Sequence, residues 1–253
     1  MTKVIMNGCN GKMGQCITNI CKADPDITIV AGIDVYQGIE NEYPVFANIR
    51  DCDVEADVII DFSTTAAVDE LLDYCEEKEM PVVLCTTGLS EEQLAKVAKV
   101  SQSTAVLKSA NMSLGVNTLI ELLRKAALVF APAGFDMEIV EKHHNLKVDA
   151  PSGTALALAD AMNDALDKAY TYKYDRSQER VKRDKYEIGI SAVRGGNIVG
   201  EHEVFFAGQD EVIEFKHTAY SKAVFAKGAV EAAKFLNGKP AGHYDMADVI
   251  AAK

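Results

Sequence analysis

The first hundred residues alternate short apolar runs with segments whose apolar residues recur at helical spacing, and this alternation constrains the fold more than any other feature. The short runs predict strands, and the helical repeats predict helices. Strands are expected over residues 3–6, 27–33, 58–62, 81–85 and 105–107, and helices over residues 12–21 and 66–78 and from Ser90 onward. Strands and helices that alternate in this way favour a doubly wound parallel sheet.

A glycine-rich turn joins the first strand to the first helix and reads Gly8-Cys9-Asn10-Gly11-Lys12-Met13-Gly14. Such a turn brings backbone N–H groups against a pyrophosphate at a helix N-terminus. The spacing departs from the usual G-x-G-x-x-G, because Asn10 stands where the second glycine falls. Asp34 ends the second strand about 20 residues later, where an acid binds the ribose hydroxyls of a dinucleotide. The pattern predicts a dinucleotide site, although a turn without a ligand can carry the same glycines.

After residue 112 the pattern changes to a mixture of helices and alternating strands. Helices are expected over residues 115–130, 152–169 and 221–236, and a strand over residues 137–141. A charged stretch without apolar periodicity spans residues 170–185. Two runs that alternate apolar and polar residues, 198–206 and 212–217, predict an antiparallel hairpin on a sheet with one covered face. The change of pattern indicates two domains, the second of α+β type.

Composition excludes several partners. The chain has 26 Lys and Arg against 38 Asp and Glu, for a net charge of −12, so a phosphate backbone or an anionic lipid surface would repel it. No signal-peptide pattern is visible, and no run approaches the roughly 18 apolar residues of a membrane span. The six cysteines show no C-x-x-C spacing, and reduced thiols are expected. We therefore expect a cytoplasmic protein that binds neither nucleic acid nor membrane.

The densest cluster of reactive residues lies between residues 141 and 155. On a strand, Glu141 and His143 would share one face while His144 points to the other. Groups that hold anions follow within a dozen residues: the imidazoles of His143 and His144, the ammonium of Lys147, and the free N–H groups of Gly153 and Thr154 behind the helix cap Ser152. The cluster predicts a site for a carboxylate or dicarboxylate that also needs a proton donor.

Two other interpretations of this cluster remain open. Paired histidines at the end of a strand can be a solvated rim without a ligand. A metal site is the second alternative, built from Glu141, one of the two histidines, and a distant His202 or His217, although the spacing matches no zinc pattern. Because His202 and His217 lie in the alternating runs, we expect them to be structural.

The segment EKHHNLKVDAPSGTA at 141–155 closely resembles the signature of bacterial dihydrodipicolinate reductases, now called 4-hydroxy-tetrahydrodipicolinate reductases, of lysine and diaminopimelate biosynthesis. The resemblance covers the whole chain. It includes GCNGKMG at 8–14, DFS at 61–63, TTG at 86–88, ANMSLGVN at 110–117 and RGGNIVGEH at 194–202.

The resemblance implies an α/β protein with a Rossmann dinucleotide-binding domain over residues 1–112 and 218–253. Residues 113–217 would form an α+β domain for substrate binding and tetramerisation, with a mixed, largely antiparallel open sheet. The implied activity is the NAD(P)H-dependent reduction of 4-hydroxy-tetrahydrodipicolinate to tetrahydrodipicolinate with loss of water, by a homotetramer. No metal is implied.

The resemblance also implies roles for individual residues. His143 would be the acid/base residue and Lys147 the proton donor, while His144, Gly153 and Thr154 would bind the substrate. The cofactor would contact Gly8, Cys9, Asn10, Gly11, Lys12, Met13, Asp34, Cys85, Thr86, Thr87, Ser109, Ala110, Asn111 and Met112. Two positions depart from the family: Met112 replaces a frequent Phe, which we expect to loosen the wall near the nicotinamide, and Lys222 replaces a frequent Arg.

The residues around Asp34 bear on the choice of cofactor. A carboxylate there accepts hydrogen bonds from the ribose but repels a 2′-phosphate. Many relatives compensate with an Arg directly after the acid, whereas uncharged Val35 and Tyr36 follow here. The nearest cation of the motif is Lys12, a flexible point charge without the bidentate fork of Arg. We expect NADH to be preferred and NADPH to remain usable.

Overall fold

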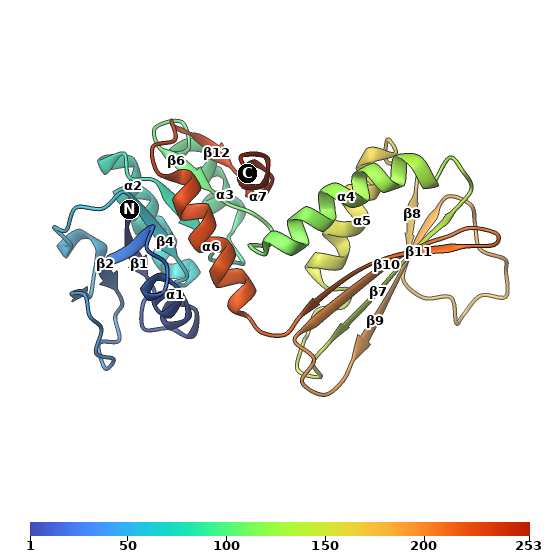
Figure 1. Ribbon diagram of the computed structural model, residues 1–253, viewed down its shortest axis with the longest axis horizontal. Coiled ribbons are helices and arrows are strands. Elements are labelled where there is room, and N and C mark those ends of the chain that lie inside the picture. The colour runs from blue at the N-terminus through green and yellow to red at the C-terminus, as the bar shows by residue number, and fades with distance from the viewer. The chain divides into compact units, whose positions relative to one another are not determined.

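The computed structural model describes all 253 residues, which divide into two compact units (Figure 1). The first unit combines Met1–Leu114 with Ala223–Lys253, and the second is Gly115–Lys222. The chain therefore leaves the first unit once and returns to it through its last helices.

The first unit, here the cofactor unit, is built on a seven-stranded sheet in the order β3-β2-β1-β4-β5-β6-β12, with every pairing parallel. The strands are β1 (Thr2–Asn7), β2 (Ile27–Ile33), β3 (Val45–Phe46), β4 (Val58–Asp61), β5 (Val82–Leu84), β6 (Ala105–Leu107) and β12 (Gly242–Tyr244). Strand order reverses between β1 and β4, and ligands of doubly wound sheets bind at the carboxyl ends of the strands on either side of such a point.

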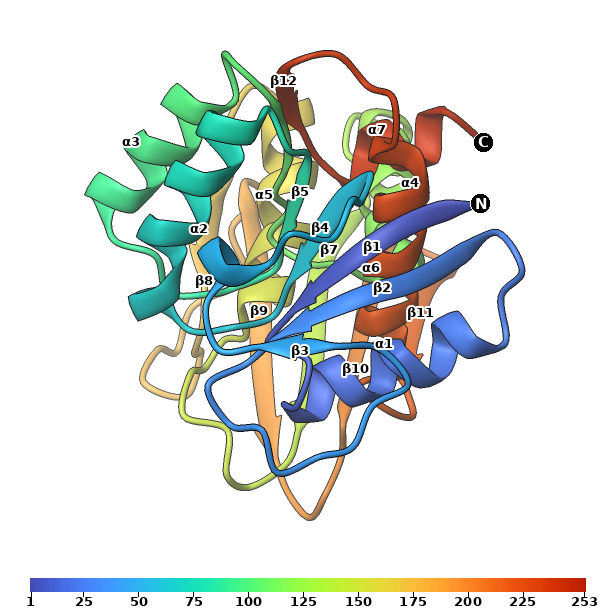
Figure 2. The same ribbon diagram turned by 90° about the vertical axis from the view of Figure 1, so that its left-hand side faces the viewer.

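Helices cover both faces of this sheet (Figure 2). One face packs against α1 (Lys12–Lys22) and α6 (Ala223–Leu236), and the other against α2 (Thr65–Lys78) and α3 (Glu91–Val100). A short 3₁₀ turn, η1 (Ile49–Asp51), and a last helix, α7 (Met246–Ala251), complete the unit. Successive strand residues therefore pack into different hydrophobic cores. Val4 lies in the core under α1 and α6, and Ile5 lies in the core under α2 and α3. Burial on both faces explains the continuous apolar strands of this half.

The second unit, here the substrate unit, is a five-stranded sheet in the order β11-β10-β7-β9-β8 with helices on one face (Figure 1). The strands are β7 (Asp136–His143), β8 (Thr171–Lys173), β9 (Glu187–Arg194), β10 (Gly200–Ala207) and β11 (Val212–Ala219), and the helices are α4 (Leu114–Phe130) and α5 (Gly153–Ala165). The predicted hairpin forms as β10 and β11. Two pairings are antiparallel and two are parallel, so the sheet is more evenly mixed than expected.

Two boundaries in the substrate unit differ from the sequence prediction. Strand β8 lies within residues 170–185, where no regular element was expected, and β9 begins directly after them. Helix α5 ends at Ala165 rather than residue 169, because Asp167 and Lys168 adopt left-handed backbone angles with φ of 56° and 57°. No glycine marks that turn, so nothing in the local sequence indicates it.

Candidate active site

The glycine turn of the cofactor unit is held by close backbone contacts. Gly8 has φ of +80°, and a Cβ on it would lie 2.5 Å from the carbonyl oxygen of Phe62. A Cβ on Gly14 would lie 2.2 Å from the oxygen of Gly8, so α1 presses against the turn. No side chain caps α1. The N–H groups of its first turn are therefore available to a phosphate, which a helix N-terminus favours.

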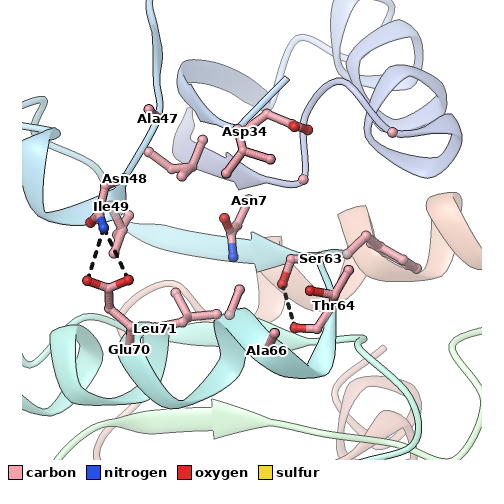
Figure 3. A pocket seen from close by; sticks show the side chains of 16 residues that line it. Asn7, Asp34, Ala47, Asn48, Ile49, Ser63, Thr64, Ala66, Glu70 and Leu71 are labelled. Atoms are coloured by element: carbon pink, nitrogen blue, oxygen red, sulfur yellow. Dashed lines mark hydrogen bonds between the residues drawn. The ribbon is translucent and has the colours of Figure 1, made fainter. Parts of the chain in front are cut away.

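A cavity of about 490 Å³ opens beside this turn (Figure 3). Its lining includes Gly8 and Gly11 from the turn, Asp34 at the end of β2, and Ser63 after β4. The far wall carries Glu70 on α2, whose two carboxylate oxygens accept from Asn48 Nδ2 at 3.0 and 3.1 Å. A glycine cradle, an uncapped helix and a carboxylate on the neighbouring strand are the parts that a dinucleotide site of this fold uses.

Asp34 is joined to the glycine turn by hydrogen bonds. Its carboxylate accepts from the backbone N–H of Asn10 at 2.9 Å and of Tyr36 at 3.0 Å. Asn10, in the place of the second glycine, therefore connects the turn to the end of β2. Val35 is 89% exposed, Lys12 is exposed, and no cation forms an ion pair with Asp34.

A second acid, Asp61 at the end of β4, is fully buried behind the cavity. It accepts from Asn7 Nδ2 at the end of β1 at 2.8 Å, from Ser63 Oγ at 2.6 Å, and from Thr86 Oγ1 after β5 at 2.6 Å. Burial raises the pKa of the Asp61 carboxyl, and the three donors oppose that shift only in part. Asp61 thus fixes the carboxyl ends of three neighbouring strands at the edge where the cofactor candidates lie.

The remaining cofactor candidates follow β5 and β6 in the same unit. Thr86 is buried and bonded to Asp61, whereas Thr87 is exposed. A Cβ on Gly228 of α6 would come within 1.6 Å of the Met112 oxygen, so α6 holds the segment after β6 by its backbone. The Met112 side chain is 5% exposed and belongs to the core of the unit. The methionine therefore fills core space, and the expected loosening of a ligand wall does not follow from it.

All six cysteines are free. Burial, with a neighbouring carboxylate, raises the pKa of the Cys9 and Cys21 thiols to about 12. These two thiols are protonated core groups at neutral pH rather than nucleophiles.

In the substrate unit, β7 ends in a buried pair. Glu141 is fully buried, and its Oε2 lies 2.6 Å from Nδ1 of His143. Arg194, at the end of β9, donates to both Glu141 oxygens at 2.7 Å. The backbone N–H of Ser152 donates to Glu141 Oε1 at 3.0 Å. The predicted position of Glu141 and His143 on one strand face is confirmed. His143 is 8% exposed, so the interpretation as a solvated rim is wrong for it.

The anion-holding groups lie next to this pair and already hold a carboxylate. Lys147 Nζ lies 2.8 Å from Asp149 Oδ1. The Lys147 ammonium, together with backbone N–H groups that include Gly153, holds the pKa of the Asp149 carboxyl below its usual value. These groups therefore favour a carboxylate at the start of α5.

The histidines do not form a metal centre. Glu141 is surrounded by donors and paired with a guanidinium, which would repel a cation. No three His, Cys, Asp or Glu side chains of the structure are grouped so that they could hold a metal ion. His202 Nε2 lies 3.0 Å from Ser152 Oγ, and burial lowers the pKa of His202 to about 4, so this histidine is neutral and structural. Nδ1 of His144 is buried without a partner.

Sequence reasoning missed three residues of these sites. Asp61, Asp149 and Arg194 each stand within a family motif, but the sequence assigns none of them a role. The partners of Asp61 and Glu141 lie up to 54 residues away in sequence, on other strands. The sequence offers one signal for such residues, which is an acid within an otherwise apolar strand. A buried carboxylate of this kind needs a hydrogen-bonding or charged partner.

Models of known families match nearly the whole chain. Residues 2–112 match the family described as dihydrodipicolinate reductase, N-terminus, and residues 115–250 match dihydrodipicolinate reductase, C-terminus. The chain belongs to the dihydrodipicolinate reductase family. The resemblance seen in the sequence motifs is thereby confirmed.

Close relatives agree with this assignment. A 4-hydroxy-tetrahydrodipicolinate reductase of Clostridium novyi (strain NT) is 49% identical over 253 residues, which is 100% of both chains. The enzyme of the same name from Clostridium tetani (strain Massachusetts / E88) is 50% identical over 246 residues, or 97% of this chain and 96% of that one. Dipicolinate-bound dihydrodipicolinate reductase from Paenisporosarcina sp. TG-14 covers 97% of both chains with a TM-score of 0.81 and 23% identity, and so supports the fold. None of the helices of the chain is both long enough and apolar enough to cross a membrane.

Proposed function

We propose that His143, Lys147 and the first turn of α5 carry the chemistry of this family in the substrate unit. As a family member, the chain is an NAD(P)H-dependent oxidoreductase that reduces 4-hydroxy-tetrahydrodipicolinate in diaminopimelate and lysine biosynthesis. The observation that carries the proposal is the convergence of a buried Glu141–His143 pair with Lys147 and Gly153 at the end of one strand.

The reaction consumes one hydride and one proton and releases one water. NAD(P)H supplies the hydride to the conjugated C=N system of the substrate when it is bound. Because the Glu141 carboxylate occupies Nδ1 of His143, His143 exchanges protons through Nε2. His143 or Lys147 gives the proton that balances the hydride and assists the loss of the hydroxyl as water. A positioned proton donor of this kind contributes about 10²–10⁴ in rate.

The substrate is a small dicarboxylate, and the unit offers donors for both of its carboxylates. Lys147 and His144 would hold one carboxylate, and the backbone groups of Gly153 and Thr154 the other. Asp149 supports this assignment, because its own carboxylate pairs with Lys147 directly before α5. The Paenisporosarcina reductase binds dipicolinate, which is also a dicarboxylate. Substrate must displace Asp149 before it can bind these donors.

The cofactor unit would hold the dinucleotide along the glycine turn, with Asp34 on the ribose. The lining of the cavity supports NADH as the preferred cofactor. Both acids that line it, Asp34 and Glu70, would repel a 2′-phosphate, and no arginine lines it. Lys12, exposed at the start of α1, is the cation through which NADPH remains usable.

The sheet of the substrate unit supports assembly as a homotetramer. Helices α4 and α5 cover one face only (Figure 1). The other face carries apolar side chains, among them Val140 and Phe205, between its charged pairs. Sedimentation of the free protein should then give four times the chain mass of 27.4 kDa, and a monomer would contradict the assembly. We also propose that the protein works in the cytoplasm, which suits its six unpaired cysteines.

A coupled assay tests the activity. The substrate is generated enzymatically, and loss of NADH absorbance is followed with the wild-type protein and with His143→Ala. Wild type should turn over, and His143→Ala should lose about 10²-fold or more in kcat. A wild-type protein without turnover would reject the function, and a normal kcat in His143→Ala would reject the role of that residue.

A further inference from the structure

The carboxylate of Glu141 lies where β7, β9 and the start of α5 meet, and it has no exposed surface. Each of its oxygens accepts two hydrogen bonds. Oε1 accepts from Arg194 Nη2 and from the Ser152 N–H, and Oε2 accepts from Arg194 Nη1 and His143 Nδ1. Burial by itself would raise the pKa of the Glu141 carboxyl, but the bonds from Arg194, His143 and Ser152 hold it below its usual value. Glu141 is therefore ionised and fully satisfied.

An ionised carboxylate only accepts hydrogen bonds, so it fixes the tautomer of its neighbour. His143 must carry its proton on Nδ1, which leaves Nε2 to exchange protons. The space around Nε2 depends on a glycine, since a Cβ on Gly200 would lie 3.1 Å from that atom. Glu141 thus determines which nitrogen of His143 faces the reaction.

The same ion pair holds the loop before α5. Arg194 Nη2 donates to the Asp149 carbonyl oxygen at 2.6 Å, while Glu141 binds the Ser152 N–H. Ser152 in turn caps α5 by accepting from the Ala155 N–H. The residues from Asp149 to Ser152 are therefore held at two points, directly before the Gly153 N–H that we assign to a substrate carboxylate.

We propose that Glu141 and Arg194 form the positioning pair of the active site, with Glu141 orienting the proton-exchanging histidine and Arg194 placing the loop that binds the substrate carboxylate. The pair acts through His143 and the loop before α5, and its role rests on the function proposed for His143 and Gly153. One salt bridge in the sheet thus positions both the histidine that exchanges protons and the loop that binds the substrate carboxylate.

The two members of the pair have separable effects. Glu141→Gln keeps the size of the side chain but removes the carboxylate that fixes the tautomer of His143. Its kcat should fall about 10- to 100-fold, as for other partners that orient a functional histidine. Arg194→Lys keeps one positive charge but loses the fork that also reaches Asp149. It should raise the substrate KM several-fold more than it lowers kcat.

The division between kcat and KM distinguishes positioning from a general structural role. Glu141→Gln should act mainly on kcat, because an amide can also donate to Nδ1 and so permits the other tautomer of His143. Arg194→Lys should act mainly on substrate KM, because it releases the Asp149 carbonyl oxygen. A general structural defect would change both parameters together in both variants.

The test measures kcat, substrate KM and NADH affinity for wild type, Glu141→Gln and Arg194→Lys. Glu203→Gln is the matched control, since Glu203 is largely buried in the same sheet and bonded to Lys142 and Lys216. The proposal predicts the losses above with unchanged NADH affinity and near-normal kinetics for Glu203→Gln. A normal kcat in Glu141→Gln, or equal losses in the control, would overturn it.

Failure of folding and failure of turnover have separate meanings. If Glu141→Gln does not fold, Arg194→Lys decides, and an unchanged substrate KM in that variant would overturn the proposal. If wild type itself does not turn over the substrate, the proposed function fails first, which the positioning variants cannot cause.

Discussion

Each unit of this reductase buries one carboxylate completely, and the two are held in opposite ways. Asp61 of the cofactor unit accepts from an amide and two hydroxyls, all of them neutral, and burial raises its pKa. Glu141 of the substrate unit accepts from a guanidinium and an imidazole, and despite burial its pKa is lowered. Neither carboxylate has exposed surface, and Asp61 is the more deeply buried of the two, so depth and partners together decide the direction of each pKa shift.

The contrast corresponds to the work of the two units. A dinucleotide is held largely by backbone groups and hydroxyls, which need fixed positions but no proton transfer. Asp61 supplies such positions by joining the ends of three strands. The role proposed for His143 needs a proton at a defined nitrogen, and the neighbouring Glu141 carboxylate fixes which nitrogen of the ring is free.

The largest effect expected from this contrast is on stability. Glu141→Gln leaves the Arg194 guanidinium partly buried without a counter-charge and should lower the free energy of unfolding by about 3 kcal/mol. Asp61→Asn keeps an acceptor among neutral donors, two of which are hydroxyls that can reverse their bonds, and should cost about 1 kcal/mol. Urea unfolding at pH 7 compares them, and equal losses would remove the distinction.

The pH dependence of the same two variants should run in opposite directions. Because the pKa of Glu141 is lowered on folding, its stabilising contribution is present above the ordinary value of 4.5 and lost as the pH falls through the folded value. Because the pKa of Asp61 is raised, its contribution is present below 3.8 and lost as the pH rises through the folded value. From pH 7 to pH 4, the cost of Glu141→Gln should shrink and that of Asp61→Asn should grow.

The next effect in size concerns the cofactor unit alone. Val35→Arg places a guanidinium beside Asp34 that can bind the 2′-phosphate of NADPH. One charge-assisted hydrogen bond is worth about 1.5–3 kcal/mol, so kcat/KM for NADPH relative to NADH should rise roughly 10- to 100-fold. Lys12→Ala should lower NADPH use and spare NADH. The ratio of kcat/KM for the two cofactors at low salt checks both. A wild-type preference for NADPH would contradict the charge argument at Asp34.

The smallest effect concerns the internal carboxylate of the substrate unit. Asp149→Asn weakens the occupant that substrate must displace from Lys147, and an exposed ion pair is worth about 0.2–1 kcal/mol. Substrate KM should therefore fall by up to about fivefold, with no change in NADH affinity. Asp164→Asn, an acid of α5 that pairs with Lys168, is the control. A rise in KM for Asp149→Asn would mean that this residue positions Lys147 instead of competing for it.

The sequence predicted the cofactor unit better than the substrate unit, for local reasons. Each of its strands and helices is visible as a local pattern of apolar residues, and Gly8 by itself indicates the tight turn between β1 and α1. In the substrate unit, β9 carries only two large apolar residues on its covered face, Ile188 and Ile190, and follows a charged stretch, so it was not predicted. Its parallel pairing with β7 depends on a long crossover that periodicity does not reveal.

The candidate site divides in the same way. That Glu141 and His143 share a face follows from the alternation of a strand, and the sequence predicted it. The contact of Arg194 with Glu141 depends on the register of β7 and β9, which sets Arg194 beside His143. The bond from Arg194 to the Asp149 carbonyl oxygen could not be predicted either, because it depends on how the loop before α5 folds back onto β9.

The central claim is that the cofactor unit binds the dinucleotide while Lys147 and His143 of the substrate unit perform the reduction. Measuring NADH affinity and substrate turnover together in Lys147→Ala tests it most directly, with Lys142→Ala, a lysine of β7 bonded to Glu201 and Glu203, as control. We expect NADH affinity within about twofold of wild type and kcat/KM for the substrate lowered by about 10²-fold or more, with the control near normal. Normal turnover in Lys147→Ala, or a parallel loss of NADH binding, would contradict it.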